Sequence, residues 1–162
     1  MLAADAAAQR LGIRPGLPAA EASAFCADLV IEDADPDGDL DHLERMALWA
    51  LRRYSPVVAA DPADGLVLDV TGAAHLFGGE EAMLADMVER LAAAGVTARA
   101  AMAGSWGAAH ALARYVASPT LCVPSDTSGR ALLALPVNCL RLPGDTVLAL
   151  GKVGIDTVGE LE

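Results

Sequence analysis

Three aspartates lie in or next to two short apolar segments, 57–60 and 65–70, that are predicted as neighbouring strands. Carboxylates in such positions could together hold a divalent cation. Asp69 cannot join Asp64, because five strand residues span about 17 Å and an odd separation turns the two side chains to opposite faces. Asp61 could approach Asp64 only if the turn at Pro62 folded back. One carboxylate without partners is a poor magnesium site, so we predict no metal here and interpret Asp64-Gly65 as a turn that opens a strand.

A second group that could do chemistry lies near the end of the chain, at Gly151, Lys152 and Gly154. The segment 142–161 has the pattern of a helix, a glycine hairpin and a second helix. Helix-hairpin-helix units present backbone amides to a phosphate, and one cation could add to such a site. An ordinary αα-hairpin has the same glycine turns, and the pattern leaves both interpretations open.

Other catalytic patterns are not supported. No nucleophile elbow G-x-S-x-G frames either Ser55 or Ser105, so a hydrolytic triad with the histidines is not indicated. The glycines of 72–79 precede no Gly-Lys-Ser/Thr, and turn formation explains them better than a phosphate loop. A disulfide framework and a zinc site are disfavoured because the three cysteines are far apart and form no C-x-x-C pair: Cys26, Cys122 and Cys139.

The composition fits one ordinary globular domain, or a small domain with an appendage, in 162 residues of which 54% are apolar. Eleven basic against twenty-two acidic residues give a net charge of −11, so tight DNA binding by this segment alone is disfavoured. No apolar run reaches the roughly 18 residues of a membrane span, and no secretory signal is visible. We therefore expect a cytoplasmic protein that does not contact membranes.

The elements that must position these residues alternate between helices and short strands. The apolar spacing of 40–54 predicts the most secure helix, with Asp39 as its N-cap and Arg52-Arg53 at its end. Further helices are predicted over 1–11, 18–25, 80–94 and 105–116, and further strands over 96–102 and 121–123, whereas 127–162 is predicted as short helices with tight turns. This order predicts an α+β fold with helices on one face of a sheet.

Several motifs together resemble the Y-family of translesion DNA polymerases. Residues 11–18 (LGIRPGLP) with 19–29 resemble the family's fingers segment, 51–56 (LRRYSP) the end of its palm helix, and 68–71 (LDVT) the strand after its catalytic carboxylates. Residues 104–115 and the terminal helix-hairpin-helix extend the likeness over nearly the whole chain. The extension 72–79 (GAAHLFGG) is similar to the ImuB branch in particular.

The resemblance implies an architecture of three parts: a fingers-like segment at 1–38, a palm-like domain at 39–124 that lacks the family's first strand, and a truncated thumb-like segment at 125–162. Family members begin with a strand carrying a metal-binding aspartate and continue beyond the thumb. The resemblance therefore implies that this chain is a fragment.

The resemblance also implies which residues should carry polymerase chemistry, and most of these differ. Asp64 aligns with the first of two adjacent carboxylates, but Gly65 replaces the expected glutamate. Ala6 and Gln9 occupy the positions of the tyrosine and arginine that hold the nucleotide phosphates. The palm lysines are missing from 104–110, and no lysine precedes Lys152. Little therefore remains to stabilise charge in the transition state.

We therefore expect a noncatalytic scaffold for DNA repair and translesion synthesis without a cofactor. Its partners, by resemblance, are an error-prone replicative-type DNA polymerase, a sliding clamp and an accessory mutagenesis protein, with at most weak DNA contact through Gly151, Lys152 and Gly154. The alternative is an active or weakly active nucleotidyltransferase that uses Mg²⁺ and completes its metal site with residues outside this chain.

Overall fold

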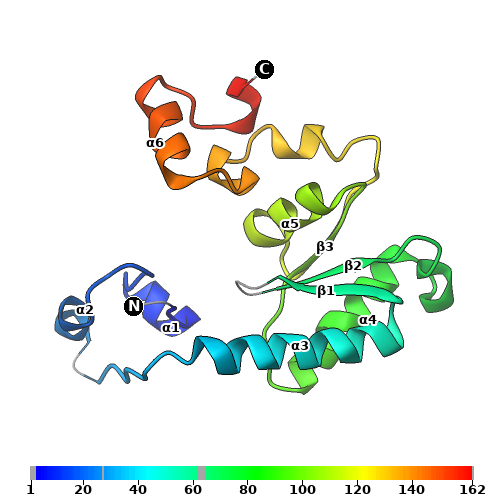
Figure 1. Cartoon of the computed structure of the whole chain (residues 1–162), viewed down its shortest axis with the longest axis horizontal. Helices are drawn as coiled ribbons and strands as arrows, with labels where there is room; N and C mark the ends of the chain where they lie inside the picture. Colours follow the sequence, from blue (N-terminus) through cyan, green and yellow to red (C-terminus); the bar gives the residue numbers. More distant parts are fainter. Residues whose placement is uncertain (1–2, 27, 62–64, 162) are drawn as a thin grey trace.

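The computed structural model describes residues 3–26, 28–61 and 65–161. Its first part is a small helical unit made of α1 (Ala6–Arg10) and α2 (Ala19–Phe25). Ile13 and Ala22 are fully buried between these helices and form a core of their own with Ala8. Figure 1 shows this unit apart from the strands, connected to them through α3 (Pro36–Arg53).

The long helix α3 begins earlier than predicted. The carboxylate of Asp35, not of Asp39, is the N-cap and accepts a hydrogen bond from the Gly38 amide at 3.0 Å. Pro36 occupies the first turn, where the absence of an amide hydrogen costs nothing. The acidic residues just before the predicted N-cap therefore belong to this helix, and the predicted boundary between residues 38 and 39 falls inside it. The division into domains stays a prediction.

The strands form two small sheets. Strands β1 (Val57–Asp61) and β2 (Gly65–Asp69) are antiparallel, and β3 (Ala100–Met102) and β4 (Thr120–Cys122) are parallel. A parallel pair requires a crossover, and α5 (Trp106–Tyr115) supplies it. Residues 96–99 were predicted as the beginning of a strand, but they lie before β3. Strand β3 has three residues, the same number as its partner β4.

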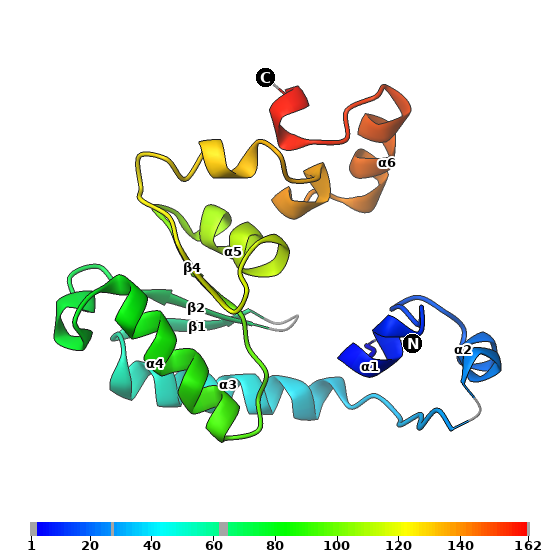
Figure 2. The same ribbon diagram turned by 180° about the vertical axis from the view of Figure 1, so that it is seen from behind.

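Two helices cover the sheets from one side. Helix α3 contacts β1 and β2, and α4 (Glu80–Ala93) contacts β3 and β4. Ala50 and Tyr54 of the α3 end and Met83 and Met87 of α4 form the buried centre, and apolar side chains of both sheets pack against them. In Figures 1 and 2, α5 lies on the opposite side of β3 and β4 from α4, so the predicted arrangement on one face holds for α3 and α4 and not for α5.

The rest of the chain is helical, as predicted, but its helices are short. The single-turn 3₁₀ segments η2 (Arg130–Leu132) and η3 (Val137–Leu140) contact α5, and α6 (Gly144–Lys152) follows. The second helix predicted for the terminal hairpin is only the 3₁₀ turn η4 (Val158–Leu161). Before η4 the chain returns to the start of η3, where the Val137 amide donates a hydrogen bond to the Asp156 carbonyl at 2.9 Å.

Candidate functional site

The end of the β1–β2 hairpin is the place at which the resemblance puts the catalytic carboxylates. The antiparallel register sets Asp61 directly opposite Gly65. Asp64 lies outside the described residues, so its predicted vestigial role stays a prediction. Asp69 is exposed at the other end of β2, opposite Val57, where its Oδ1 accepts a hydrogen bond from the Thr71 amide at 3.0 Å. Hydrogen bonds from Thr71 lower the pKa of Asp69.

Helix α5 brings two basic side chains to this hairpin end. His110 Nε2 lies 3.4 Å from Asp61 Oδ2, and Arg114 Nη2 lies 3.5 Å from the same oxygen. Positions four residues apart share one face of a helix, so the His110 imidazole and the Arg114 guanidinium both reach the strand from a single surface of α5. Asp61 and His110 are mostly buried, with 16% and 10% of their side chains exposed.

Gly65, which the resemblance aligns with a glutamate of the family, is also close to this pair. A Cβ atom built at Gly65 would lie 3.3 Å from Arg114 Nη2 and 3.8 Å from the Cβ of Asp61. The Arg114 guanidinium therefore lies beside the position at which a glutamate side chain would begin. Its positive charge would repel a divalent cation at short range. Among the described residues, which do not include Asp64, no group of three His, Cys, Asp or Glu side chains is placed so that it could hold a metal ion.

Sequence reasoning considered His110 only with the other histidines, as part of a hydrolytic triad, and did not single out Arg114. The spacing of four residues between His110 and Arg114 on a predicted helix indicates that the two side chains share one face. It does not indicate that this face contacts the hairpin, because that contact depends on how α5 crosses the sheet.

The positions that resemble the family's nucleotide-binding residues have structural roles here. Ser105 caps α5 by accepting a hydrogen bond from the Ala108 amide at 3.3 Å. The Trp106 ring stacks beneath the Arg141 guanidinium, whose central carbon lies 3.7 Å from the ring centroid. A Cβ at Gly104 would lie 2.8 Å from the Ser125 Cα, so this close approach requires glycine. In α1, Gln9 donates to the Ala4 carbonyl at 2.7 Å, and Ala6 contributes helix backbone.

The motifs LRRYSP and GAAHLFGG meet in the palm core. Tyr54 is 3% exposed and stacks on Phe77 with 5.2 Å between ring centroids. Its hydroxyl donates to Asp86 Oδ2 at 2.7 Å, and Arg53 and Arg90 also contact this carboxylate. The Tyr54 hydrogen bond is the main cause that lowers the pKa of Asp86, whereas burial raises the pKa of Tyr54. Asp86, which sequence reasoning did not single out, therefore joins α4 to the end of α3.

The three residues predicted to contact a DNA phosphate lie together and are exposed. Gly151 and Lys152 form the end of α6, and Gly154 has a left-handed φ of 80°. The amides of Gly154 and Ile155 donate to the Gly151 and Leu150 carbonyls, and Glu160 accepts hydrogen bonds from the Asp156 and Thr157 amides at 2.9 and 2.8 Å. These bonds lower the pKa of Glu160. Most of the local amides are therefore already hydrogen-bonded within the chain.

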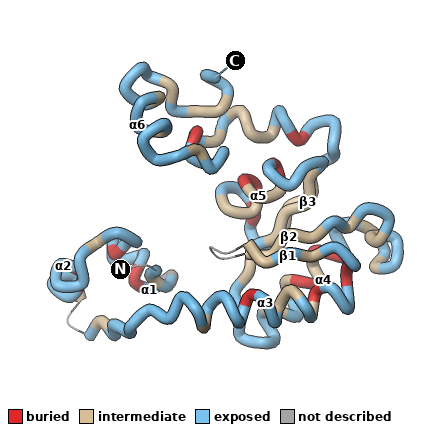
Figure 3. Tube along the Cα trace, in the orientation of Figure 1, coloured by how far each residue is buried: buried red, intermediate tan, exposed pale blue. Residues whose placement is uncertain are grey.

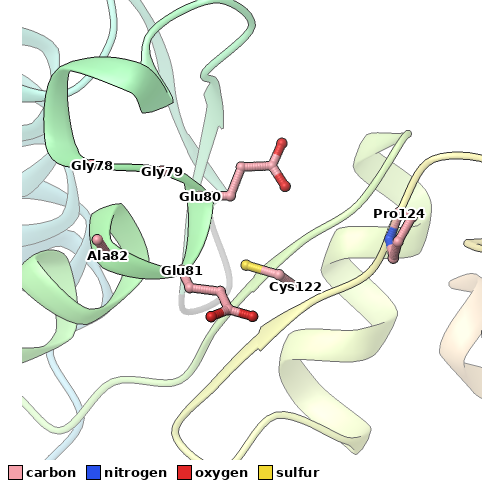
Figure 4. A pocket seen from close by; sticks show the side chains of 7 residues that line it. All are labelled: Gly78, Gly79, Glu80, Glu81, Ala82, Cys122 and Pro124. Atoms are coloured by element: carbon pink, nitrogen blue, oxygen red, sulfur yellow. The ribbon is translucent and has the colours of Figure 1, made fainter.

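A separate hollow lies beside the start of α4 (Figure 4), where Cys122 of β4 lies near Glu80 and Glu81. Burial, and then the two carboxylates, raise the pKa of the Cys122 thiol. A thiol that stays protonated is a poor nucleophile and a poor metal ligand, so this hollow does not resemble a catalytic site.

Comparison with known proteins assigns the family and the fold of this chain. Residues 1–114 match the impB/mucB/samB family, and the chain belongs to this family of Y-family polymerase-like proteins. The structure superposes on DinB from Sulfolobus solfataricus with a TM-score of 0.65 at 15% identity, over 93% of this chain and 45% of that one, which confirms the predicted fold class.

Within the family the chain is ImuB-like. It is 46% identical over 151 residues to Protein ImuB of Caulobacter vibrioides strain NA1000 / CB15N, covering 93% of this chain and 32% of the relative. It is 31% identical over 172 residues to DNA polymerase IV 2 of Mesorhizobium japonicum, covering 99% of this chain and 39% of that protein. The chain thus spans about a third of the length of these curated relatives. Among the described residues, no helix is long and apolar enough to cross a membrane.

Proposed function

We propose that this chain is part of a noncatalytic, ImuB-like scaffold for DNA damage tolerance by translesion synthesis. The observation that carries the proposal is the composition of the β1–β2 hairpin end. Gly65 supplies no carboxylate, and the Arg114 guanidinium lies 3.3 Å from the position of its missing Cβ. A site with a glycine in place of the glutamate and with the Arg114 guanidinium beside it lacks a carboxylate ligand for Mg²⁺. It also lacks the negative electrostatic potential that attracts Mg²⁺.

The shape of the polymerase domain is nevertheless maintained by specific contacts. Tyr54, Phe77 and Asp86 join the two motifs most characteristic of the resemblance, and none of them lies at the hairpin end. A protein that keeps the fold while it loses the metal site is suited to bind other proteins. We propose as partners an error-prone replicative-type DNA polymerase, a sliding clamp and an accessory mutagenesis protein.

DNA contact by this part of the protein is proposed to be weak and to depend on Lys152. The amides near Gly151 and Gly154 are largely engaged within the chain, so the lysine side chain is the main group left for a phosphate. Lys152→Glu in the full-length protein should weaken DNA binding at low salt, with Arg99→Glu as the control for total charge. Equal weakening by both variants would indicate a nonspecific charge effect and contradict a contact at Lys152.

The central test uses the full-length protein with primer–template DNA, nucleotide triphosphates, and Mg²⁺ or Mn²⁺. We expect no primer extension, and no metal binding by titration calorimetry with or without nucleotide. Metal-dependent extension that Asp64→Ala abolishes would overturn the proposal and support the alternative, an active nucleotidyltransferase whose metal site is completed outside this chain.

A further inference from the structure

The outward face of α3 carries charges that are separated by sign along the helix. At 100° per residue, the exposed side chains of this face fall within an arc of about 140°. Asp37, Asp41 and Glu44 lie in the first half of the helix, and Arg45 and Arg52 lie in the second. The buried residues Leu43 and Ala50 lie on the other side of the helix.

Three leucines lie among these charges. Leu40, Leu48 and Leu51 are 37%, 53% and 43% exposed, and Figure 3 shows that the first half of α3 is mostly exposed. Leu48 also lines a shallow hollow with Trp49 and the arginines of this helix. Arginine and tryptophan beside exposed apolar side chains are typical of protein interfaces.

Several of these charges have no partner within the described part of the chain. Asp37, Glu44 and Arg52 make no side-chain hydrogen bond or ion pair there, whereas the neighbouring Arg53 is bound to Asp86. Arg45 bonds the Asp41 carbonyl and lies 3.3 Å from the His42 ring, which keeps its guanidinium on the helix surface. The face therefore combines exposed apolar side chains with charged side chains, several of which have no partner within the described part of the chain.

The pattern is self-complementary only when two such helices run antiparallel. A two-fold axis between residues 44 and 45 sets Asp37 opposite Arg52 of the second helix, a pair that occurs twice, and it brings the acidic first half of each helix alongside the basic second half of the other. A parallel pair would instead set each charge against its own copy, which is unfavourable.

We propose that α3 pairs antiparallel with α3 of a second copy of this chain, through an isologous interface centred between Glu44 and Arg45. The inference is independent of the proposed noncatalytic function. The basic half of the face, with Arg45 and Arg52, should bind an acidic segment. The acidic first half of α3 in a second copy is such a segment, with a similar length and spacing of charges. Because 18 residues of helix extend over about 27 Å, the interface is smaller than a standard one, and the dimer is weak and weakened by salt.

The test is analytical ultracentrifugation of the 162-residue chain over a concentration series at low and high salt. The unsubstituted chain should show concentration-dependent dimerisation that salt weakens. The double variant R45E/R52E makes the whole face acidic, and D37R/E44R makes it basic. Each alone should lose at least tenfold in dimer affinity, and an equimolar mixture of the two should recover association as a heterodimer.

The recovery in the mixture separates a loss of pairing from a loss of folding, and far-UV circular dichroism of each variant checks the helix content. Arg99→Glu, at an exposed position outside α3, is the matched control and should dimerise like the unsubstituted chain. The proposal is overturned by a monomer at every concentration, by variants that dimerise normally, or by a mixture that stays monomeric. Association of this face with another protein or with DNA, in a chain that stays monomeric, would likewise replace it.

Discussion

Two regions of the palm-like part differ in what they have kept. The junction of α3, α4 and η1 (Ala74–Phe77) has a buried tyrosine, a stacked phenylalanine and a carboxylate with three partners. The hairpin end has Gly65, where the resemblance places a glutamate, next to an arginine. The first region determines how the elements pack, and the second is where the resemblance places phosphoryl-transfer chemistry.

The difference teaches that a fold and its chemistry depend on separate groups of residues. Removal of Tyr54 would expose or empty the centre of the core, whereas a glycine at the hairpin end leaves the strand pairing of β1 and β2 intact. A chain can therefore lose a metal site without losing its shape, because catalytic side chains contribute little to packing.

Tyr54→Ala should have the largest effect on the first region. It removes a buried ring that contacts Phe77 and Trp49, and such truncations cost about 3–5 kcal/mol of unfolding free energy. Urea denaturation followed by circular dichroism measures the loss. Leu76→Ala, in the same segment as Phe77 but 74% exposed, is the control and should change stability by less than about 0.5 kcal/mol. Similar losses in both variants would show that the Tyr54 junction has no special role.

Gly104→Ala should have the next largest effect and tests whether the stretch that resembles the family's nucleotide-binding residues has a structural role in this chain. Its Cβ would lie within 3 Å of Ser125 backbone and side-chain atoms, and overpacking of this kind costs about 1–3 kcal/mol. Gly107→Ala, in α5 with open space around it, should instead stabilise the chain by about 0.5–1 kcal/mol. Thermal unfolding of both variants measures the contrast, and a shift of the same sign in both would contradict the packing argument.

Tyr54→Phe isolates the hydrogen bond to Asp86 and carries a pH dependence. The bond lowers the folded-state pKa of Asp86, so its contribution is fully present above the unfolded pKa of about 3.9 and is lost as pH falls through the folded value. Because Asp86 is partly exposed, we expect a loss of only about 1 kcal/mol at neutral pH, and a smaller difference between the two proteins in acid. Carboxyl NMR should show a higher Asp86 pKa in the variant; an unchanged pKa would refute this assignment.

The sequence predicted the elements of this fold well where a local signal was strong. The apolar spacing after residue 40 predicted the body of α3, and glycines predicted the start and end of α4. The start of α3 was wrong, because an acidic run with a proline and a glycine is typical of a loop as well as of a capped helix. Only the Asp35 hydrogen bond to the Gly38 amide distinguishes the two.

The candidate site was harder to predict, because its contacts join residues far apart in the chain. Gly65 was identified from the motif alone, but Arg114 reaches it from α5, almost fifty positions later, and no local pattern gives that distance. Asp86 was missed for the same reason, since its partners Arg53 and Tyr54 lie on another helix.

The smallest expected effect comes from placing a glutamate at position 65, as the resemblance would have it. Gly65→Glu should place a carboxylate beside Arg114, so the new charge pairs with the guanidinium and no millimolar Mg²⁺ binding appears in titration calorimetry. Gly65→Gln is the matched neutral variant. Because Arg114 is 27% exposed, the glutamate variant should exceed it in stability by only about 0.2–1 kcal/mol in urea denaturation. Mg²⁺ binding by the glutamate variant and not by the glutamine variant would show that the hairpin end is one substitution away from a metal site, and the contrast between the two regions would then rest on Gly65 alone.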